Sequence, residues 1–525
     1  MNPSRSMGNV LKLTEAAEYV RVSERTLREM ARSGRVPCQR VGREWRFLRK
    51  ALDEWLIGNK PAADGSGAVA EPSQMYLPTL ERVPEFTETG FGDTAFTKNR
   101  EEPMHRWVPW IAGFSASFVG EILDRELDSS KAGKVLDPFA GVGTTLIESL
   151  RRNRDVVGFE INPYAALACQ VKIEALRFQP RSVRKLAHEL ESYLRSRLRD
   201  GSAAPRSAPP TAFRTHDPFF SPAVERQVLV AKDFIAEQQQ DGARRLLRLA
   251  LGSVMVGMSN YSYEPSLGRR IAAGKKMILD ADVAGILRDK LLHMALDLEI
   301  LQRSLPETKR QPTAQVFNES YLEFGAQRLG IASVDVLVTS PPYLNNYHYV
   351  RNTRPHMFWL DFVTDTAELH ELEASSFGKF WQTVRSEPDL ALAFSYPDLE
   401  VKLRELRSVN SDKGPYGGPG WANYAVTYFN DCARFCEVTA QIMKPGGLVV
   451  VVIGNNILQG IEFKTDEIFA HIAQKSGFEI QGLHRVRKKR TGSSIVNSSV
   501  RVGITRKKTE LYETAVELRR ISKAQ

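Results

Sequence analysis

The segment Thr-Ser-Pro-Pro-Tyr at residues 339–343 has residue types and an order that suit chemistry on an amino group. It follows residues 334–338, a largely apolar run that predicts a buried strand. Pro341 and Pro342 end that strand, fix the backbone and carry no N–H to donate. The backbone carbonyls and the Ser340 hydroxyl are therefore left as acceptors for an incoming NH₂ group.

The amino nitrogen of cytosine or adenine is a poor nucleophile because its lone pair is delocalised into the ring. Two acceptors that hold its protons would return electron density to nitrogen and aim it at a methyl donor, which is largely an effect of positioning. If the amino group belongs to a base stacked in a duplex, that base must be flipped out before it can reach such a pocket. Tyr343 would offer its ring face to the extruded base.

A second segment predicts the element that positions a methyl donor. Residues 134–136 form a short apolar strand, residues 137–145 form a glycine-containing turn, and residues 146–152 continue as a helix. Gly141 and Gly143 would allow close approach of a ligand to the backbone, and the helix start offers free N–H groups. This order predicts a nucleotide-like ligand at the carboxyl edge of a parallel sheet.

An acidic residue follows at the expected distance. The next predicted strand, residues 156–159, ends in Glu160, which lies about where a ribose-binding acid belongs in such folds. The turn lacks the Gly-Lys-Ser/Thr of a phosphate loop, and it lacks the Gly-x-Gly-x-x-Gly signature of dinucleotide sites. The ligand is therefore expected to be neither a nucleoside triphosphate nor NAD.

The sequences DPFAGVGTT and GFEINPYA closely resemble the S-adenosylmethionine-binding motif of amino-methylating DNA methyltransferases. The resemblance implies that the turn surrounds the methionine part of the cofactor, that Glu160 binds the ribose hydroxyls and that Asn162 lies near the adenine. The implied cofactor-binding residues are Asp137, Pro138, Phe139, Ala140, Gly141, Gly143, Thr144, Thr145, Glu160 and Asn162. A tight structural turn with an N-capping Asp is the alternative.

The segment TSPPY resembles the catalytic motif of the N4-cytosine and N6-adenine DNA methyltransferases, which implies catalytic roles for Ser340, Pro341, Pro342 and Tyr343. Serine in the first position of that tetrad is commoner among the cytosine-N4 enzymes, so we favour cytosine, with adenine N6 as the alternative. Methylation at C5 of cytosine needs a nucleophilic cysteine. The only Pro-Cys pair, Pro37-Cys38, lies in a different part of the chain.

The resemblance implies an α/β fold, a Rossmann-like methyltransferase domain with a seven-stranded sheet and helical insertions. Residues 448–453, after a glycine turn, resemble the next strand of that sheet. Residues 477–490 and 499–506 suggest its reversed terminal hairpin, and residues 105–127 resemble the helix that closes over the cofactor.

The amino-terminal part carries much of the positive charge. Between Arg21 and Lys50 there are ten basic residues against three acidic ones. A helix at residues 24–32 with Ser23 as N-cap, a hairpin at 36–47 and a short helix at 48–56 resemble the winged helix-turn-helix of excisionase and MerR-like domains. The implied DNA-binding residues are Arg25, Thr26, Arg28, Arg32, Arg40, Arg43 and Arg46. A small domain with a solvated basic face, or one that binds a protein, is the alternative.

These motifs predict three parts: a winged helix-turn-helix domain at residues 1–57, a flexible linker at 58–85 and a methyltransferase domain at 86–525. The last divides into a cofactor part (100–176), a helical insertion (177–314) and a catalytic part (315–507). Residues 259–263, together with 386–424, are candidates for target recognition. A purely structural insertion is the alternative.

The length and composition of the whole chain indicate the class of protein. A length of 525 residues, with 42% hydrophobic and 26% charged side chains, predicts a globular protein of more than one folded unit. No signal peptide, membrane span, zinc site or disulfide framework is indicated, so we expect a cytoplasmic protein without a metal. The net charge of +10 favours a polyanion, here double-stranded DNA, with a partner restriction endonuclease as a further candidate.

Two other classes of protein are alternatives. A transcription regulator with a non-catalytic methyltransferase-like part is disfavoured because both motifs are intact. An RNA methyltransferase is disfavoured by the DNA-type helix-turn-helix.

Overall fold

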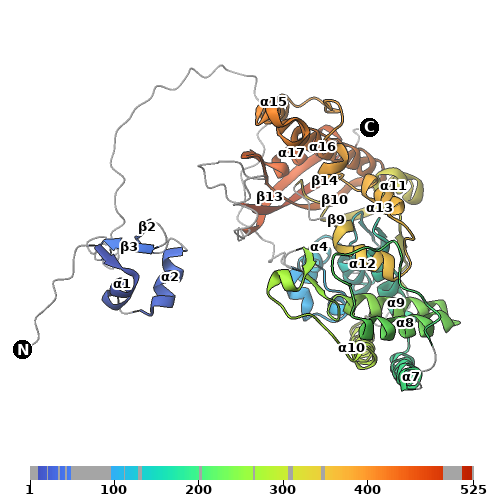
Figure 1. Ribbon diagram of the computed structural model, residues 1–525. Helices are drawn as coiled ribbons and strands as arrows, with labels where there is room; N and C mark the ends of the chain where they lie inside the picture. Colours follow the sequence, from blue (N-terminus) through green and yellow to red (C-terminus); the bar gives the residue numbers. More distant parts are fainter. Residues whose placement is uncertain are drawn as a thin grey trace, which may run out of the picture. The chain divides into compact units, whose positions relative to one another are not determined.

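The computed structural model describes residues 10–20, 22–32, 36–41, 44–48, 52, 96–110, 113–127, 133–199, 204–263, 266–305, 311–344, 349–488 and 511–522. The chain divides into two compact units, Met1–Leu80 and Glu81–Gln525 (Figure 1). None of the helices in these ranges is long and apolar enough to cross a membrane.

The first unit is a three-stranded antiparallel sheet with two helices. Its elements are β1 (Val10–Lys12), α1 (Leu13–Tyr19), α2 (Glu24–Arg32), β2 (Gln39–Val41) and β3 (Glu44–Leu48), and the sheet order is β1-β3-β2. The helix expected at residues 24–32 has the predicted bounds, and the Ser23 Oγ accepts from the Thr26 N–H at 3.1 Å. Leu27 and Phe47 lie in the small core. Of the helix expected at 48–56, Leu48 is instead the last residue of β3, so the expected start is wrong, and Leu52 is helical and buried; the other residues lie outside the described ranges.

A seven-stranded sheet forms the centre of the second unit. Its order is β13-β14-β10-β9-β4-β5-β8, and six strands run in one direction while β14 runs in the other. The strands are β4 (Lys134–Asp137), β5 (Asp155–Phe159), β8 (Ala314–Phe317), β9 (Val334–Thr339), β10 (Met443–Gly454), β13 (Phe478–Lys488) and β14 (Tyr512–Arg520). The expected α/β fold with a mostly parallel sheet is therefore present.

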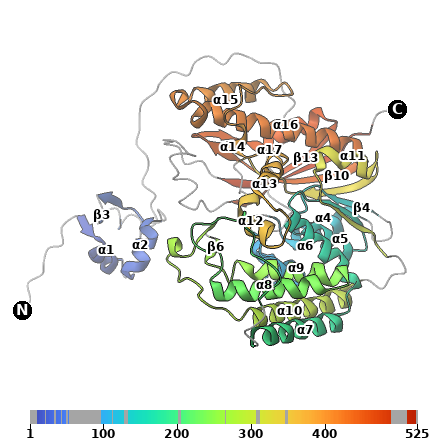
Figure 2. The same cartoon turned by 45° about the vertical axis from the view of Figure 1, so that its right-hand side comes forward.

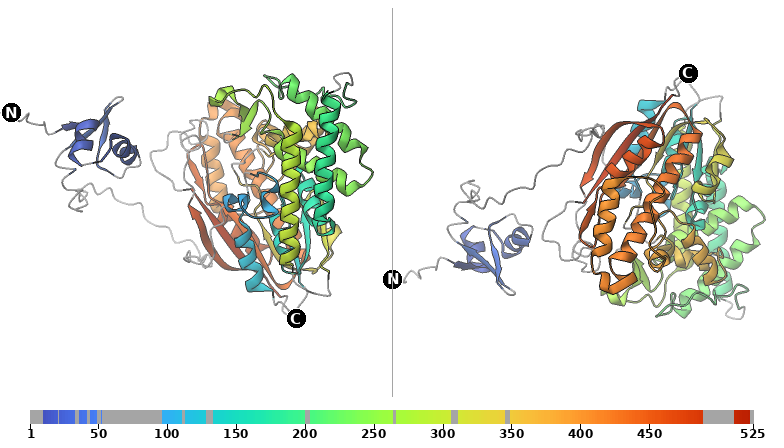
Figure 3. Two further views of the ribbon diagram at one scale, coloured as in Figure 1. Left: turned by 90° about the horizontal axis from the view of Figure 1, so that it is seen from below. Right: turned by 90° about the horizontal axis from the view of Figure 1, so that it is seen from above.

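Helices cover both faces of this sheet (Figure 3). On one face lie α4 (Ala116–Glu126), α5 (Thr144–Arg151) and α6 (Pro163–Glu174), which contribute side chains to a core that also contains residues of β4 and β5. On the other face lie α11 (Tyr321–Leu329), α16 (Gly418–Ile442) and α17 (Thr465–Lys475), whose core contains residues of β9 and β10. Burial on both faces explains why the central strands are continuous apolar runs.

The insertion between β5 and β8 is helical and packs around α6 (Figure 2). It consists of α7 (Pro180–Arg199), α8 (Pro222–Glu237), α9 (Asp241–Met255), the short hairpin β6 (Tyr261–Tyr263) and β7 (Leu267–Arg269), and α10 (Val283–Ser304). A second helical segment lies between β9 and β10. Before α16 it comprises α12 (Tyr349–Trp359), α13 (Thr366–Ala374), α14 (Trp381–Val384) and α15 (Pro397–Ser408).

Two expectations about the second unit are wrong. Residues 105–127 do not form one helix: a 3-10 turn, η2 (His105–Trp107), precedes α4, which begins only after Ser115 caps it. Pro109 lacks the N–H that a continuous helix needs, and Gly113 has a φ of 151°. The strand that pairs with β13 is β14 at Tyr512–Arg520, so the sheet extends beyond residue 507; residues 499–506 lie outside the described residues.

Candidate active site

The two segments that carry the expected chemistry meet at one edge of the sheet. Strand β4 pairs in parallel with β9, which brings their carboxyl ends together. There the Thr339 hydroxyl donates to Oδ1 of Asp137 at 2.6 Å. Because Thr339 is the first residue of TSPPY and Asp137 is the first residue of the glycine turn, this hydrogen bond joins the two segments directly. The structure therefore brings together two segments that lie about 200 positions apart in the sequence.

The Asp137 carboxylate is buried at the start of this turn, with only 1% of the residue exposed. Its Oδ1 also accepts from the Phe139 N–H at 3.1 Å. Burial raises the pKa of Asp137 to about 6, and the hydroxyls of Thr339 and Thr145 limit that rise by donating to the ionised form. Asp137 therefore changes charge close to neutral pH.

The glycine turn has the backbone conformation that its sequence predicts. Gly141 and Gly143 have φ angles of 50° and 86°, in the left-handed region that favours glycine. Gly143 is the N-cap of α5, so Thr144 and Thr145 form the first turn of that helix. An added Cβ on Gly141 would lie 3.4 Å from Nε1 of Trp110, which therefore packs against the turn.

Helix α6 holds the turn through two side chains that the sequence did not single out. The Cys169 thiol donates to the Gly141 carbonyl at 3.2 Å, and Nζ of Lys172 donates to the Val142 carbonyl at 2.7 Å. Lys172 is fully buried, and burial lowers its pKa to about 8. Both residues lie on α6 beyond the end of the GFEINPYA segment, so only the fold reveals them.

Glu160 follows β5 and closes the other side of the turn. Its Oε2 accepts from the Gly141 N–H and its Oε1 accepts from the Asn162 N–H, each at 2.8 Å. Loss of hydration raises the pKa of Glu160 to about 7, and the nearby Asp137 charge adds to that rise. Each carboxylate oxygen accepts one backbone N–H and retains a lone pair for a ligand hydroxyl.

Asn162 has a structural role in this geometry. Its Oδ1 caps α6 by accepting from the N–H groups of Tyr164 and Ala165, and its Nδ2 donates to Oγ1 of Thr353 on α12 at 2.7 Å. The side-chain amide, only 3% exposed, is thus bonded within the protein at both ends. The contact of Asn162 with α12 could not be read from the sequence.

The remaining residues of the turn face the core. Pro138 and Ala140 are buried, and the Ala140 N–H donates to the Phe159 carbonyl at 2.9 Å. The Phe139 ring packs against Phe377 and Phe435, with centroids 5.1 and 5.9 Å away. These contacts fix the backbone of the turn. The side chains of Pro138, Phe139 and Ala140 pack in the interior, so only their backbone is available to a ligand.

The TSPPY segment continues from β9 toward β10. The Ser340 hydroxyl lies 3.2 Å from the Val452 carbonyl oxygen and 3.4 Å from the Tyr343 hydroxyl oxygen. Donation of its single proton to Val452 leaves the lone pairs of Ser340 available as acceptors. Pro341 is buried, whereas Pro342 is partly exposed.

The Tyr343 ring is partly buried, and its nearest atom would lie 3.7 Å from a Cβ on Gly454 at the end of β10. Its hydroxyl also interacts with Glu513 on β14, and burial raises the pKa of Tyr343 well above its usual value. The phenol therefore stays neutral, and residues of β10 and β14 fix its position.

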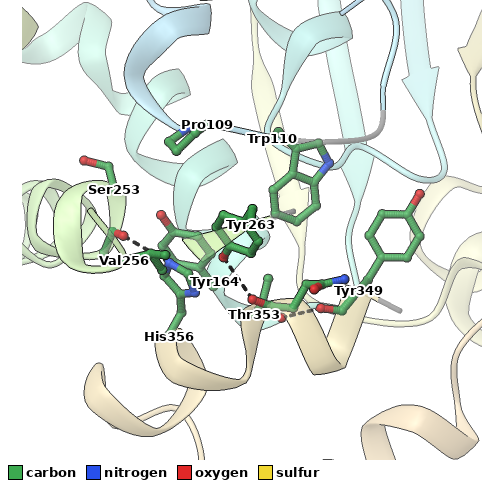
Figure 4. A pocket seen from close by; sticks show the side chains of 11 residues that line it. Pro109, Trp110, Tyr164, Ser253, Val256, Tyr263, Tyr349, Thr353 and His356 are labelled. Carbon is green, nitrogen blue, oxygen red and sulfur yellow. Dashed lines mark hydrogen bonds between the residues drawn. The ribbon is translucent and has the colours of Figure 1, made fainter. Parts of the chain in front are cut away.

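A pocket with aromatic walls adjoins the glycine turn (Figure 4). It encloses about 470 Å³ of empty space, its open mouth included. Trp110 and Tyr349 stack with ring centroids 6.1 Å apart and form part of its wall. The Tyr164 hydroxyl is buried without a hydrogen-bond partner among the described residues. A pocket of this kind, with planar walls and an unpaired polar atom, suits a planar heterocyclic ligand.

Helix α10 of the insertion holds the segment that carries Trp110. Asp297, which is fully buried, accepts from the Met104 N–H at 2.9 Å and from Nε1 of Trp107 at 3.0 Å, and pairs with Arg106 at 2.5 Å. Nζ of Lys290 donates to the Trp107 carbonyl at 2.5 Å. The wall of the pocket therefore depends on a helix from the middle of the insertion.

The expected DNA-binding residues of the first unit lie on the predicted elements. Arg25, Thr26, Arg28 and Arg32 are on α2, Arg40 is on β2 and Arg46 is on β3, whereas Arg43 lies outside the described residues. Thr26 and Arg28 are exposed. The Arg46 guanidinium pairs with Glu44 at 2.5 Å and donates to the Trp45 carbonyl at 3.2 Å, so part of its charge is already compensated.

Comparison with known families agrees with the division of the chain into two units. Residues 10–60 match a family described as a helix-turn-helix domain. Residues 118–170 match a family described as DNA methylase, and this stretch contains the glycine turn, Glu160 and Asn162.

Full-length relatives are also similar to the chain. It is 21% identical over 440 residues to the type II methyltransferase M.BsoBI of Geobacillus stearothermophilus, covering 76% of this chain and 83% of the relative. It is 23% identical over 415 residues to the type II methyltransferase M.AvaI of Anabaena variabilis, covering 74% and 81%. For the type II methyltransferase M.MvaI of Kocuria varians, identity is 21% over 385 residues, covering 72% and 82%.

Proposed function

We propose that this chain, which matches a helix-turn-helix family at residues 10–60 and a DNA methylase family at residues 118–170, is an amino-group DNA methyltransferase that methylates N4 of cytosine in double-stranded DNA. The proposed methyl donor is S-adenosylmethionine, whose sulfonium supplies an electrophilic methyl group. The observation that carries the proposal is the 2.6 Å contact between Thr339 and Asp137, because it joins the TSPPY segment to the glycine turn.

The residues of the turn fit this donor. The left-handed conformations of Gly141 and Gly143 keep side chains away from the place where a ligand would approach the backbone. Glu160 retains one lone pair on each oxygen, which suits the two hydroxyls of a ribose. The neighbouring aromatic pocket and the unpaired Tyr164 hydroxyl offer a place for a planar heterocycle. We therefore assign Asp137 to Thr145 and Glu160 to donor binding, with Asn162 holding α6 in place.

Ser340 and the carbonyls beside Pro341 act on the amino group of the base. The Ser340 hydroxyl, with its proton directed to the Val452 carbonyl, accepts one N–H of the substrate. This contact orients the nitrogen lone pair, which is an effect of positioning and needs no change of charge on serine. The Tyr343 ring, fixed beside Gly454, stacks on the extruded base.

DNA is held by more than one part of the chain in this proposal. The helix-turn-helix domain would place α2 in the major groove, where Arg25, Thr26, Arg28 and Arg32 reach base edges or phosphates. Arg40, Arg43 and Arg46 on and around the β2–β3 hairpin would contact the backbone. In a cell, the protein would modify a short site, alone or beside an endonuclease that cleaves the unmodified site.

One experiment tests the activity and the target base. The full-length protein and its Ser340→Ala variant are expressed in a host without DNA methylation, and the DNA is digested to nucleosides for mass spectrometry. We expect N4-methylcytosine from the wild type and at least a hundredfold less from the variant, on the order of the loss when one positioned polar group is removed. N6-methyladenine would overturn the cytosine assignment, and a wild type that leaves no modified base would overturn the proposed activity.

A further inference from the structure

An arginine held between two aromatic rings is the strongest feature that the proposed function does not use. The guanidinium carbon of Arg385 lies 4.7 Å from the ring centroid of Trp381 on α14 and 4.3 Å from that of Tyr416. Tyr416 is the last residue of the 3-10 segment η5 (Ser411–Tyr416) and is 62% exposed. Arg385 is partly exposed as well, so this cluster reaches the surface.

The hydrogen-bond donors of the Arg385 side chain are unused within the described part of the chain. A guanidinium carries five N–H donors in a planar fork. Among the residues that the structure describes, no carboxylate or carbonyl accepts from the fork of Arg385, and its contacts are those with the two rings. By contrast, Arg407 on α15 donates to the Leu390 carbonyl at 2.6 Å and lies 3.6 Å from Asp389. Arg385 is thus held but not paired, which indicates a ligand outside the chain.

Helix α16 fixes this cluster from below. Its Trp421, which is buried, stacks on Trp381 with ring centroids 5.2 Å apart. An added Cβ on Gly420 would lie 3.0 Å from the Cβ of Arg385, so the helix start packs closely on the segment that carries the arginine. The buried Asn423 side chain donates to the backbone carbonyl two residues after Arg385 at 2.9 Å. A side chain that is already fixed loses little conformational freedom when it binds a ligand.

The cluster is connected to the edge of the sheet where the TSPPY segment lies. Strand β10 ends at Gly454, beside Tyr343, and the chain continues into β11 (Asn456–Leu458). The next residue, Gln459, accepts from Nδ2 of Asn410 at 3.2 Å, and Asn410 is the N-cap of η5. Five residues of chain span at most about 18 Å, which is the length of about five base pairs of duplex DNA. A duplex with a base at Tyr343 can therefore also contact the segment that carries Tyr416.

From this arrangement we infer that Arg385 recognises a guanine of the DNA site by donating to its O6 and N7 atoms in the major groove. The inference rests on the proposed function, since it names a residue that selects the DNA on which methyl transfer acts. The planar fork of arginine matches these two acceptors, and this pairing is the commonest base-specific contact in protein–DNA complexes. The rings of Trp381 and Tyr416 fix the plane of the fork. A contact with phosphate alone needs charge but no fixed plane, so the stacking favours a base.

The test compares the DNA sites that the full-length protein and its variants methylate. Each protein is expressed in a host without DNA methylation, and single-molecule sequencing of the host DNA reports the modified positions and their sequence context. We expect the wild-type site to contain a guanine at a fixed position, and the Arg385→Ala variant to lose about tenfold or more of the preference for it. The modified base should stay the same. A variant that methylates the wild-type site with unchanged preference would overturn the inference.

A chemically altered guanine tests the contact itself. Duplexes with the wild-type site carry either guanine or 7-deazaguanine at that position, and the altered base pairs normally but lacks the N7 acceptor. The kcat/KM of the wild type should fall about tenfold on 7-deazaguanine, whereas the Arg385→Ala variant should methylate both duplexes equally well. If the two proteins are equally sensitive to the change, or if the wild type does not respond to it, the assignment to Arg385 is wrong.

Two further variants control for folding and for charge. Arg385→Lys keeps a cation beside the rings, so it should fold even if the alanine variant does not. Lysine lacks the planar fork, so this variant should also lose the sensitivity to N7. Arg404 is exposed on α15, and Arg404→Ala should keep both the wild-type site and the sensitivity to 7-deazaguanine. Loss of the same guanine preference in the Arg404 variant would contradict a specific role of Arg385.

Selection of bound duplexes separates this inference from the proposed function, because it needs no methyl transfer. The full-length wild type and the Arg385→Ala variant each select from a pool of random duplexes, and the bound sequences are read. The helix-turn-helix domain is the same in both proteins, so a guanine that only the wild type enriches reports Arg385. If this guanine is found but the wild type transfers no methyl group, the proposed activity fails and the base contact stands. If methyl transfer occurs at the same site in both proteins, the base contact fails alone.

Discussion

Lowering the pH from about 8 to about 6 is expected to weaken donor binding because both carboxyls of the site titrate in this range. The raised pKa values of Glu160, about 7, and Asp137, about 6, mean that acidification protonates them within the folded protein. Only an ionised Glu160 can accept from both hydroxyls of a ribose, and a protonated carboxyl must lose its proton first. Donor affinity should therefore fall as the pH decreases through these values.

The magnitude follows from the ionised fraction of Glu160. With a pKa of about 7, roughly nine tenths of Glu160 is ionised at about pH 8 and roughly one tenth at about pH 6. The apparent dissociation constant scales inversely with the competent fraction, so donor affinity should drop about tenfold, or about 1.4 kcal/mol. Half-protonation of Asp137 at about pH 6 would add a factor of about two if its charge is also required.

Isothermal titration calorimetry in two buffers of different ionisation enthalpy measures both the affinity and the protons released. Near about pH 6.5, donor binding should release on the order of one proton from the wild type. The Glu160→Gln variant should bind the donor more weakly at every pH and lose most of the pH dependence. If the wild-type affinity is the same at about pH 6 and about pH 8 and no proton is released, the reasoning that an ionised Glu160 with a raised pKa binds the donor is refuted.

Three further predictions test the surroundings of the site. Gly143→Ala should destabilise the protein by about 1–2 kcal/mol in chemical denaturation, because its φ of 86° is left-handed, and should also weaken donor binding; unchanged stability would contradict the described turn. Thr339→Val removes a donor to Asp137, so the pKa of Asp137 should rise above about 6 and the acid limb of the methylation pH profile should move to higher pH. Asp297→Ala should cost about 3 kcal/mol in urea unfolding, since it leaves Trp107 and Arg106 without their buried partner.

The strand–turn–helix that carries the glycine turn could be predicted from the sequence because its requirements are local. A buried strand, a turn with left-handed glycines and a helix start are each specified by a few neighbouring residues. The same holds for residues 334–343, where the prolines end β9 as expected. The meeting of β4 with β9 followed from the fold that the motifs implied, because parallel strands place their carboxyl ends on one edge.

The contacts that hold these motifs could not be predicted, because they join residues with no local signature. Cys169 and Lys172 bond to the turn only because α6 crosses it, and Thr353 meets Asn162 only because α12 returns over the end of β5. The prediction of one helix at residues 105–127 failed for a similar reason, because distant contacts decide the structure there. Its aromatic residues are spaced for burial, but they are buried by a 3-10 turn and an extended segment that other elements hold.

The role of the insertion follows from where its contacts lie. An independent recognition module or a structural spacer would share few interactions with the cofactor part. Instead, Asp297 fixes the segment that leads to Trp110, and Tyr263 lines the pocket beside the glycine turn. The same insertion also contacts α12, where the Asn352 side chain accepts from the Leu267 N–H. Because the insertion supplies part of the pocket wall, a movement of α8–α10 would also move that wall, so donor affinity is expected to depend on how the insertion packs.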